Sequence, residues 1–276
     1  MEQLVKKLKR WKFVKSNYPN AQLLETNVAD WENIKVPHTW NSEDVLLAKK
    51  SRLSFIKKDN GLYYMGVGWY RKELPLEEDL SGKRFFLRFQ AASIRAEVYV
   101  NEKLVGTHNG AFSAFCFEIT EFLHEDQPNV IAVKVDNERK SDIAPISGDF
   151  PVMGGLYRPV ELIIKNRTCI SPLDFGSPGV YISQTQVTDE LATVEVKSLV
   201  SLVEDGKDIR IKVSIYDASN NLVVNKVVDL GTIRTPNLET KCELSVEDPH
   251  LWHGVFDPYL YKVSVELFEG ETLVDE

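Results

Sequence analysis

The segment ISGDFPVMGGLYRPVEL holds the residues of this sequence whose types and spacing are most suggestive of chemistry. Asp149 lies a few positions before Gly154, Gly155 and Arg158. A glycine pair permits a tight turn or close backbone approach, so the carboxylate is expected on an irregular segment ahead of a strand. From spacing alone, Asp149 could pair with Arg158 or Arg71, cap a turn, or contact a ligand.

No complete catalytic signature accompanies this carboxylate. Hydrolysis of a glycosidic bond needs two carboxyl groups facing each other across the sugar, and 41 acidic residues offer too many pairs for the sequence to select one. The sequence has no G-x-S-x-G, P-loop, G-x-G-x-x-G or H-E-x-x-H motif. His250 and His253 come nearest to metal-ligand spacing, but hydrogen bonding is the favoured role. Cys116, Cys169 and Cys242 are widely spaced and are expected to be small core side chains, so no metal site is predicted.

The composition is that of an ordinary globular protein, with 43% hydrophobic and 27% charged residues. A net charge of -8 argues against a surface that tracks phosphates, so no nucleic-acid partner is expected. The basic start, VKKLKRWK, is interpreted as a solvated edge strand or tail. No apolar run approaches the roughly 18 residues that span a bilayer, and no signal-peptide block is present, so no membrane partner is expected. Localisation stays open between periplasm and cytoplasm.

Alternation of apolar and polar residues predicts an all-β protein. Strands are expected in the first half at GWYRKELPL, RFFLRFQA, AEVYV, LVGTHN, AFCFEIT, NVIAVKVDN and RPVELIIKN. In AEVYV, the side chains of Ala96, Val98 and Val100 should share the buried face. The short NEK sequence after it should form a hairpin turn. Thr120 is expected to be the N-cap of one helical turn in TEFLHED.

A stretch rich in Pro, Gly and Ser, NRTCISPLDFGSPG, predicts a boundary near Ser177 and therefore domains of 1–177 and 178–276. The second half has strand patterns at VYISQTQV, ATVEVKSLVSLV, IRIKVSIYD, LVVNKVVDL, LETKCELSV and LYKVSVELFE, a spacing typical of an immunoglobulin-like sandwich. ETLVDE should pair back onto the preceding strand as a hairpin. About six strands are counted where such a sandwich has about seven. We therefore expect the second domain to be truncated at its last strand and the chain to be a fragment of a longer polypeptide.

Four motifs in order carry a family likeness: VPHTWN at 36–41, GWYRKEL at 68–74, AEVYVNEKLVGTHNGAF at 96–112 and GDFPVMGGLYRPVEL at 148–162. Together they resemble the N-terminal region of glycoside hydrolase family 2 enzymes, most closely β-galactosidases. DPHLWHGVFDPYLYKVSVEL resembles the sandwich that follows in that family. The RPV sequence is also met in β-glucuronidases of the family, which leaves the substrate open.

The resemblance implies a jelly-roll-like β-sandwich followed by an immunoglobulin-like β-sandwich. In the family a (β/α) barrel comes next and carries both catalytic glutamates, so these would lie after Glu276. This chain alone is then expected to be inactive and to supply no catalytic residue. Asp149, followed by Gly155, Leu156 and Arg158, matches the acid with which the first domain of β-galactosidases reaches the barrel's pocket. There it contacts sugar hydroxyls and, in some members, a sodium ion.

The resemblance therefore implies the non-catalytic front of a retaining hydrolase of terminal β-galactosides, with Asp149 binding substrate. Its partners would be a β-galactoside or oligosaccharide and the catalytic barrel of the same polypeptide. A homo-oligomer is compatible with the resemblance. No cofactor is expected in this chain, whereas a sodium or magnesium ion is allowed in the full-length enzyme. Arg158, Pro37 and Trp40 are interpreted as structural. Two alternatives remain: a free-standing carbohydrate-binding module, or a fragment of a β-glucuronidase of the same family.

Overall fold

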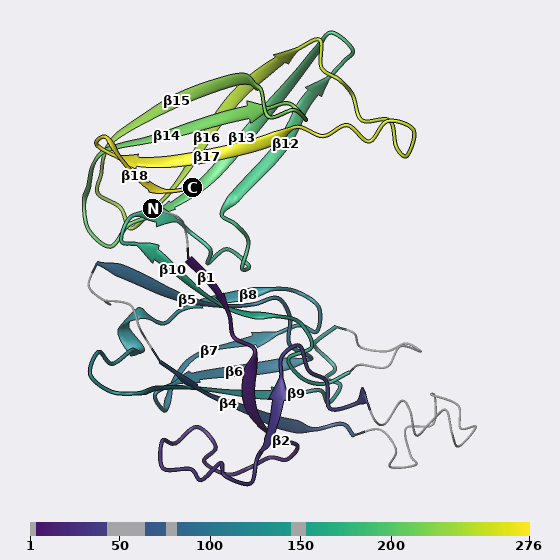
Figure 1. Cartoon of the computed structure of the whole chain (residues 1–276), viewed down its shortest axis with the longest axis vertical. Helices are drawn as coiled ribbons and strands as arrows, with labels where there is room; N and C mark the ends of the chain where they lie inside the picture. The colour runs from purple at the N-terminus through teal and green to yellow at the C-terminus, as the bar shows by residue number, and fades with distance from the viewer. Residues whose placement is uncertain (1–3, 43–63, 76–81, 145–152) are drawn as a thin grey trace. The chain divides into compact units, whose positions relative to one another are not determined.

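The computed structural model describes residues 4–42, 64–75, 82–144 and 153–276. Its contacts divide the chain into two compact units. The N-terminal sandwich is Val5–Ile164, and the C-terminal sandwich is Lys165–Glu276 together with the segment Met1–Leu4, of which only Leu4 is described. Figure 1 colours the first from purple to teal and the second from green to yellow. Among the described residues, no helix is long and apolar enough to cross a membrane.

The N-terminal sandwich consists of two sheets (Figure 1). The four-stranded sheet has the order β1 (Leu4–Lys7), β10 (Val160–Asn166), β5 (Lys83–Phe89), β8 (Phe115–Glu118). The six-stranded sheet has the order β3 (Glu32–Lys35), β2 (Arg10–Val14), β4 (Val67–Leu74), β9 (Asn129–Asp136), β6 (Arg95–Val100), β7 (Lys103–Asn109). Together with the C-terminal sandwich, this confirms the predicted all-β class.

Alternation along β6 positions its side chains as the sequence predicts. Ala96, Val98 and Val100 are fully buried and belong to the main apolar cluster of this sandwich, whereas Glu97 and Tyr99 on the other face are half-buried. A half-buried strand of this kind gains stability mainly from the apolar area on one face. The strand therefore fixes one wall of the core.

The turn between β6 and β7 is the predicted hairpin. Asn101 and Glu102 have φ angles of 48° and 70°, the left-handed conformation that a two-residue primed turn requires. Val100 pairs with Lys103 directly beyond them. The amide of Asn101 also bonds Asn129 and the backbone of Val130, so this turn is tied to the start of β9.

The expected helical turn exists, but the N-cap prediction for Thr120 is wrong. A 3₁₀ turn, η2 (Thr120–Phe122), begins at Thr120 itself, and Ile119 occupies the N-cap position without a side-chain capping bond. The Thr120 hydroxyl instead accepts a 2.9 Å hydrogen bond from the Phe85 backbone and donates to the Glu118 carboxylate at 3.1 Å. The Thr120 hydroxyl therefore connects the turn to β5, which contains Phe85.

The basic N-terminal sequence forms two strands rather than one edge or tail. β1 lies at the edge of the four-stranded sheet, as expected. β2 lies inside the six-stranded sheet, between β3 and β4. β2 was not predicted as a separate strand, because its cations were interpreted as solvated charge, and β3 was not predicted at all.

The C-terminal sandwich has two four-stranded sheets around a second apolar core. In one, β13 (Leu191–Ser201) pairs with β11 (Cys169–Ile170), β12 (Val180–Val187) and β16 (Asn237–Glu247). The other has the order β15 (Leu222–Ile233), β14 (Gly206–Tyr216), β17 (Lys262–Glu269), β18 (Thr272–Asp275). The pairing of β18 back onto β17 confirms the predicted hairpin. All three cysteine side chains are buried, as predicted.

A buried ion pair lies in this C-terminal unit. Lys165 Nζ is 2.6 Å from Asp275 Oδ2, and their side chains are 4% and 3% exposed. The same carboxylate oxygen accepts a hydrogen bond from the Ile170 backbone at 2.7 Å. Because both charges are withdrawn from water, each depends on the other for compensation.

Candidate functional site

The candidate site consists of the two stretches of chain directly before and directly after residues 145–152. Asp149, predicted to contact the substrate, lies outside the described residues. The chain on both sides of it is packed into the N-terminal sandwich. Ile143 is 8% exposed and joins an apolar cluster with Ile94 and Ala111, and Gly154 is buried. The described part of the site is therefore the set of contacts that hold these two ends.

Gly154 and Gly155 are required by close packing, as the sequence predicts. A Cβ atom on Gly154 would lie 2.0 Å from the Trp40 ring. Gly155 has a φ of 114°, and a Cβ there would lie 2.4 Å from the Tyr70 hydroxyl and 2.7 Å from the His38 carbonyl oxygen. Neither position can accept a larger residue without moving buried groups. The chain thus leaves 145–152 along one fixed path.

Asn41 connects this path to the rest of the sandwich. Its side chain is fully buried, and Oδ1 accepts a 2.7 Å hydrogen bond from the Gly154 backbone. The same oxygen accepts from Asn137 Nδ2 at 3.3 Å, while Asn41 Nδ2 donates to the Tyr64 carbonyl at 2.9 Å. Asn137 in turn accepts from the Gly66 backbone at 2.8 Å. A buried amide network of this kind favours one backbone arrangement, because every broken bond exposes a polar group to an apolar interior.

His38 and Tyr70 hold the next residue, Leu156. The His38 backbone donates to the Leu156 carbonyl at 2.8 Å, and the Leu156 backbone donates to the Tyr70 hydroxyl at 3.3 Å. His38 Nδ1 lies 2.8 Å from that hydroxyl. Burial lowers the pKa of His38 to about 4 and raises the pKa of Tyr70. Both side chains are therefore neutral near pH 7, which suits a positioning role rather than proton transfer.

Trp40 has the structural role that the sequence suggested. Trp40 is 4% exposed and stacks on Phe13 with ring centroids 5.8 Å apart. The peptide bond between Val36 and Pro37 is cis. The VPHTWN segment therefore provides both the apolar wall and, through Asn41, the polar anchor of the site.

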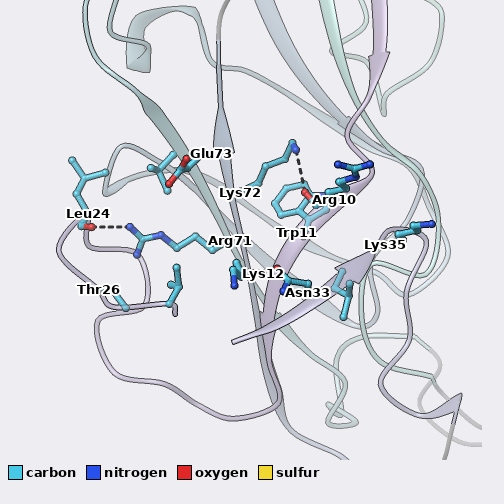
Figure 2. Close-up of a pocket in the computed structure, with 13 residues that line it drawn as sticks. Arg10, Trp11, Lys12, Leu24, Thr26, Asn33, Lys35, Arg71, Lys72 and Glu73 are labelled. Carbon is cyan, nitrogen blue, oxygen red and sulfur yellow. Dashed lines mark hydrogen bonds between the residues drawn. The ribbon is translucent and has the colours of Figure 1, made fainter. Parts of the chain in front are cut away.

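The two arginines considered as partners of Asp149 differ in their surroundings. Arg71 is buried, and its guanidinium donates to the carbonyl oxygens of Ala21 and Leu23. It also donates to the Leu24 carbonyl at 2.9 Å (Figure 2). Arg71 therefore holds the segment that contains those carbonyls. Arg158 is exposed and lies over the Tyr157 ring, 5.7 Å from its centroid.

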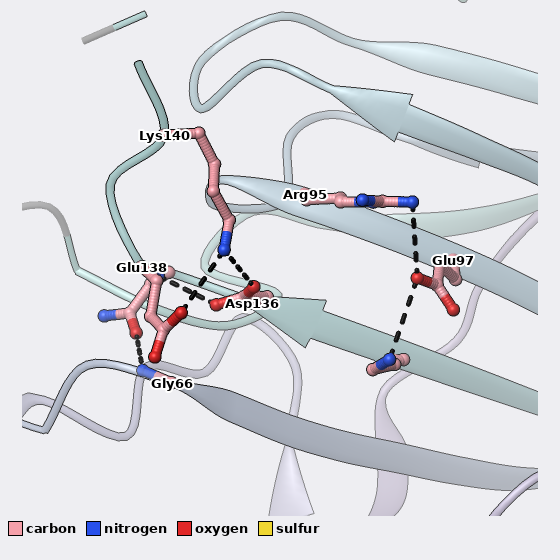
Figure 3. Close-up of polar contacts among 8 residues, drawn as sticks. Gly66, Arg95, Glu97, Asp136, Glu138 and Lys140 are labelled. Carbon is pink, nitrogen blue, oxygen red and sulfur yellow. Dashed lines mark hydrogen bonds and ion pairs between the residues drawn. The ribbon is translucent and has the colours of Figure 1, made fainter. Parts of the chain in front are cut away.

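The carboxylates at the end of β9 are paired with cations (Figure 3). Lys140 Nζ lies 3.2 Å from both Asp136 Oδ2 and Glu138 Oε2, and these hydrogen bonds raise the pKa of Lys140. Glu97 lies 3.6 Å from Arg95 in a similar surface pair. Paired, solvated carboxylates of this kind serve surface electrostatics better than acid–base catalysis. Among the described residues, no group of His, Cys, Asp and Glu side chains could hold a metal ion.

His250 has the hydrogen-bonding role that the sequence favoured, whereas His253 contributes a backbone hydrogen bond. His250 Nε2 lies 2.7 Å from Asp257 Oδ2, and its ring stacks on Tyr259 with centroids 3.9 Å apart. The His253 backbone donates to the Asp257 carbonyl at 2.7 Å. These contacts brace the turn that follows Pro249.

The sequence analysis missed four residues that build the site: His38, Asn41, Tyr70 and Asn137. Each lies within a sequence that was singled out for another reason, either as a family motif or as a strand. Asn137 closes the NVIAVKVDN strand sequence, which was a usable signal, since a polar residue at the end of a strand often bonds an irregular neighbour. These residues meet one another and the chain at Gly154–Leu156 through contacts between residues 32 to 113 positions apart.

Comparison with known proteins gives two family matches in order along the chain. Residues 5–166 match the model described as glycosyl hydrolases family 2, sugar binding domain, and residues 179–276 match the model described as glycosyl hydrolases family 2. A β-glucuronidase of Bacteroides fragilis is 34% identical over 247 residues, which are 89% of this chain and 34% of that protein. A β-galactosidase of Thermoanaerobacter pseudethanolicus is 28% identical over 271 residues, or 96% of this chain and 33% of that protein.

Solved structures agree with the sequence matches. The crystal structure of a Bacteroides uniformis β-glucuronidase superposes with a TM-score of 0.89 at 33% identity, covering 99% of this chain and 32% of that one. The chain thus spans about a third of the length of the relatives it matches. The matches include both sandwiches.

Proposed function

This chain belongs to glycoside hydrolase family 2, and on that basis we propose that it forms the non-catalytic N-terminal region of a retaining β-glycosidase. The observation that carries the proposal is the pair of family matches in order, 5–166 and then 179–276. In the proposed arrangement, the catalytic acid/base and nucleophile belong to a barrel beyond the second sandwich. The 276-residue chain alone is then expected to be inactive. The domain limits of 1–177 and 178–276 remain a prediction.

The sugar removed by the whole protein is proposed to be a terminal β-glucuronide, with a terminal β-galactoside as the second candidate. The B. fragilis relative and the B. uniformis structure, both named β-glucuronidase, support the first. The T. pseudethanolicus relative, named β-galactosidase, supports the second. VPHTWN is one of the four motifs whose resemblance favoured β-galactosidases, and its Trp40 and Asn41 side chains pack inside the sandwich. A buried packing motif is a poor guide to the sugar.

We propose that Asp149 contacts the sugar. It precedes Gly154 and Gly155, whose positions are fixed by contacts within the N-terminal sandwich. Support comes from the fixed path at Gly154 and Gly155 and from the buried Asn41 that bonds it. A substrate contact needs a backbone that does not drift, because a displacement of about 1 Å can remove most of its benefit. A sodium or magnesium ion near this carboxylate in the whole protein also remains a prediction.

The proposed barrel would be a partner of the C-terminal sandwich. Support comes from four large apolar side chains in the sequence after Pro249, with Trp252 64%, Val255 90%, Phe256 88% and Leu260 69% exposed. Soluble proteins rarely expose so many large apolar groups in one short stretch unless another surface covers them. A homo-oligomer remains a prediction.

The test uses the full-length protein and its Asp149→Ala variant with 4-nitrophenyl β-glucuronide and β-galactoside. We expect hydrolysis of the glucuronide and a fall in kcat/KM of about 10- to 100-fold in the variant, the usual effect of losing a hydrogen bond to a charged group. The melting temperature should change little. Asp126→Ala is the matched control, because Asp126 is an exposed acid elsewhere on the N-terminal sandwich.

Different failures have different meanings. If neither substrate is hydrolysed by the unchanged protein, the proposed activity is wrong. If Asp149→Ala lowers the melting temperature strongly but leaves kcat/KM unchanged, Asp149 has a structural ion pair and the activity proposal stands without it.

A further inference from the structure

A wide groove is lined by residues of β3, β2 and β4 in the six-stranded sheet (Figure 2). Its volume is about 840 Å³, which lies within the range of ordinary ligand sites. All of its lining residues belong to the N-terminal sandwich. None of them is among the residues that contact Gly154, Gly155 or Leu156 in the candidate site.

The groove is basic in an acidic chain. The chain has a net charge of -8. The groove nevertheless has a single acidic lining residue, Glu73, against five basic ones: Arg10, Lys12, Lys35, Arg71 and Lys72. A concave surface lined by one sign of charge focuses its field and concentrates counter-ions. The expected ligand is therefore anionic.

The cations oppose one another directly across the sheet. Arg10 pairs with Lys35 between β2 and β3, and Lys12 pairs with Arg71 between β2 and β4. Like charges at directly opposed positions destabilise a sheet, whereas opposite charges there stabilise it. No carboxylate lies within ion-pair distance of Arg10, Lys12 or Lys35 in the part of the chain that the structure describes. If these cations were only a solvated surface, replacing any one of them with an acidic residue would increase the stability of the sheet.

Not every cation is available to a ligand. Arg71 donates to three backbone carbonyls, and Lys72 Nζ donates to the Arg10 carbonyl at 3.0 Å. Arg10 and Lys35 are exposed, and Lys12 is half-buried. Lys12 Nζ also donates to the Trp31 carbonyl at 3.5 Å, a long bond that leaves its other two N–H groups for a ligand. Arg10 and Lys35, with the exposed amide of Asn33 opposite Lys12 and these remaining Lys12 protons, form the accessible set of donors.

We propose that this groove binds an anionic glycan, a sugar chain that bears carboxylates or sulfates. The domain matches a sugar-binding model. The lining combines cations for the acidic groups with the Asn33 amide for sugar hydroxyls. The Thr26 hydroxyl donates to the Asn20 carbonyl at 2.6 Å, so it can accept a hydrogen bond from a sugar hydroxyl. Trp11 is buried, at 3% exposed, so it offers no stacking surface and neutral sugars should bind weakly. The site does not depend on which terminal sugar the whole protein cleaves.

The test is calorimetric titration of the 276-residue chain at low salt with three polymers of matched length. Hyaluronan carries only carboxylates, dextran sulfate only sulfates, and dextran neither. Binding of either acidic polymer, weakened by added NaCl because the ion pairs are exposed, supports the proposal, and the arm that binds identifies the acidic group. Binding of dextran with equal affinity would overturn it, and so would the absence of binding to both acidic polymers.

Lys35→Glu separates loss of the site from loss of the fold. Reversing this charge should weaken binding about tenfold, since one attraction is replaced by a repulsion. The new carboxylate would oppose Arg10, so the melting temperature should stay the same or rise. Lys103→Glu is the matched control, an exposed strand lysine outside the groove, and should bind like the unchanged chain.

Three results would contradict the proposal. One is equal weakening by Lys35→Glu and Lys103→Glu, which would mean that only net charge matters. Another is unchanged binding in Lys35→Glu. The third is a single-stranded oligonucleotide that binds more tightly than both acidic glycans and loses affinity in Lys35→Glu, which would assign the groove to nucleic acid.

Discussion

Asn41→Ala tests whether the buried amide network fixes the path of the chain next to residues 145–152. The substitution removes the side-chain oxygen that accepts the Gly154 backbone N–H at 2.7 Å, and an orphaned buried donor costs about 1–3 kcal/mol. It also removes the donor to the Tyr64 carbonyl, which contributes about 1 kcal/mol. The free energy of unfolding of the N-terminal sandwich should therefore fall by about 2–4 kcal/mol.

Urea unfolding followed by tryptophan fluorescence measures this change. Four of the five tryptophans, at positions 11, 31, 40 and 69, lie in the N-terminal sandwich, so the signal reports mainly on that unit. With a slope of about 2 kcal/mol per molar urea, the midpoint should fall by about 1–2 M. Hydrogen exchange at the Gly154 amide should accelerate as well.

The matched control is Asn109→Ala, because Asn109 is an exposed asparagine on β7. Its effect should stay within about 0.5 kcal/mol. An Asn41→Ala midpoint equal to that of the control, with unchanged protection of Gly154, would refute the reasoning that Asn41 holds this end of the segment.

Two further predictions concern charge and pH. Lys165→Met leaves the Asp275 carboxylate buried without its cation, so calorimetry should show that the C-terminal sandwich is destabilised by about 3–5 kcal/mol. The control Lys212→Met removes a partly exposed pair with Glu266 and should cost at most about 1 kcal/mol. Equal effects of the two substitutions would contradict the argument from burial. Burial lowers the pKa of His38 from 6.5 to about 4, so the unfolded state binds a proton first as pH falls and stability is lost between these two values, by at most about 2 kcal/mol after allowance for partial exposure. His38→Gln should remove that part of the loss in urea titrations at pH 7 and pH 4, and parallel pH profiles for the two proteins would contradict it.

The sequence predicted those parts of the fold in which alternation and burial coincide. β6 has apolar residues at 96, 98 and 100 and buries all three, so period-two patterning located it correctly. The pattern did not predict β2, because its outward residues are the cations Arg10 and Lys12 and its two inward residues, Trp11 and Phe13, are too few to give a clear alternation. A short strand inside a sheet can satisfy its backbone through its neighbours without a strong pattern of its own.

The site was predictable in part for a similar reason. The glycine pair at 154 and 155 signalled close approach, because few other causes place two glycines before a strand. Its contacts with Trp40, Tyr70 and His38 could not be read from the sequence, since they join segments separated by more than 80 residues. Thr120 shows the opposite case, in which a local capping rule was overridden by a hydrogen bond from β5.

The distribution of charge within the N-terminal sandwich argues that its basic groove is not a by-product of composition. At the end of β9, the carboxylates of Asp136 and Glu138 share Lys140, as expected where pairing reduces repulsion. The chain has 41 acidic and 33 basic residues, so carboxylates are the commoner charge. Arg10 nevertheless faces Lys35. A charge pattern that lowers stability where the opposite charge is abundant is best explained by a function, and for this reason Lys35→Glu should raise stability and weaken glycan binding together.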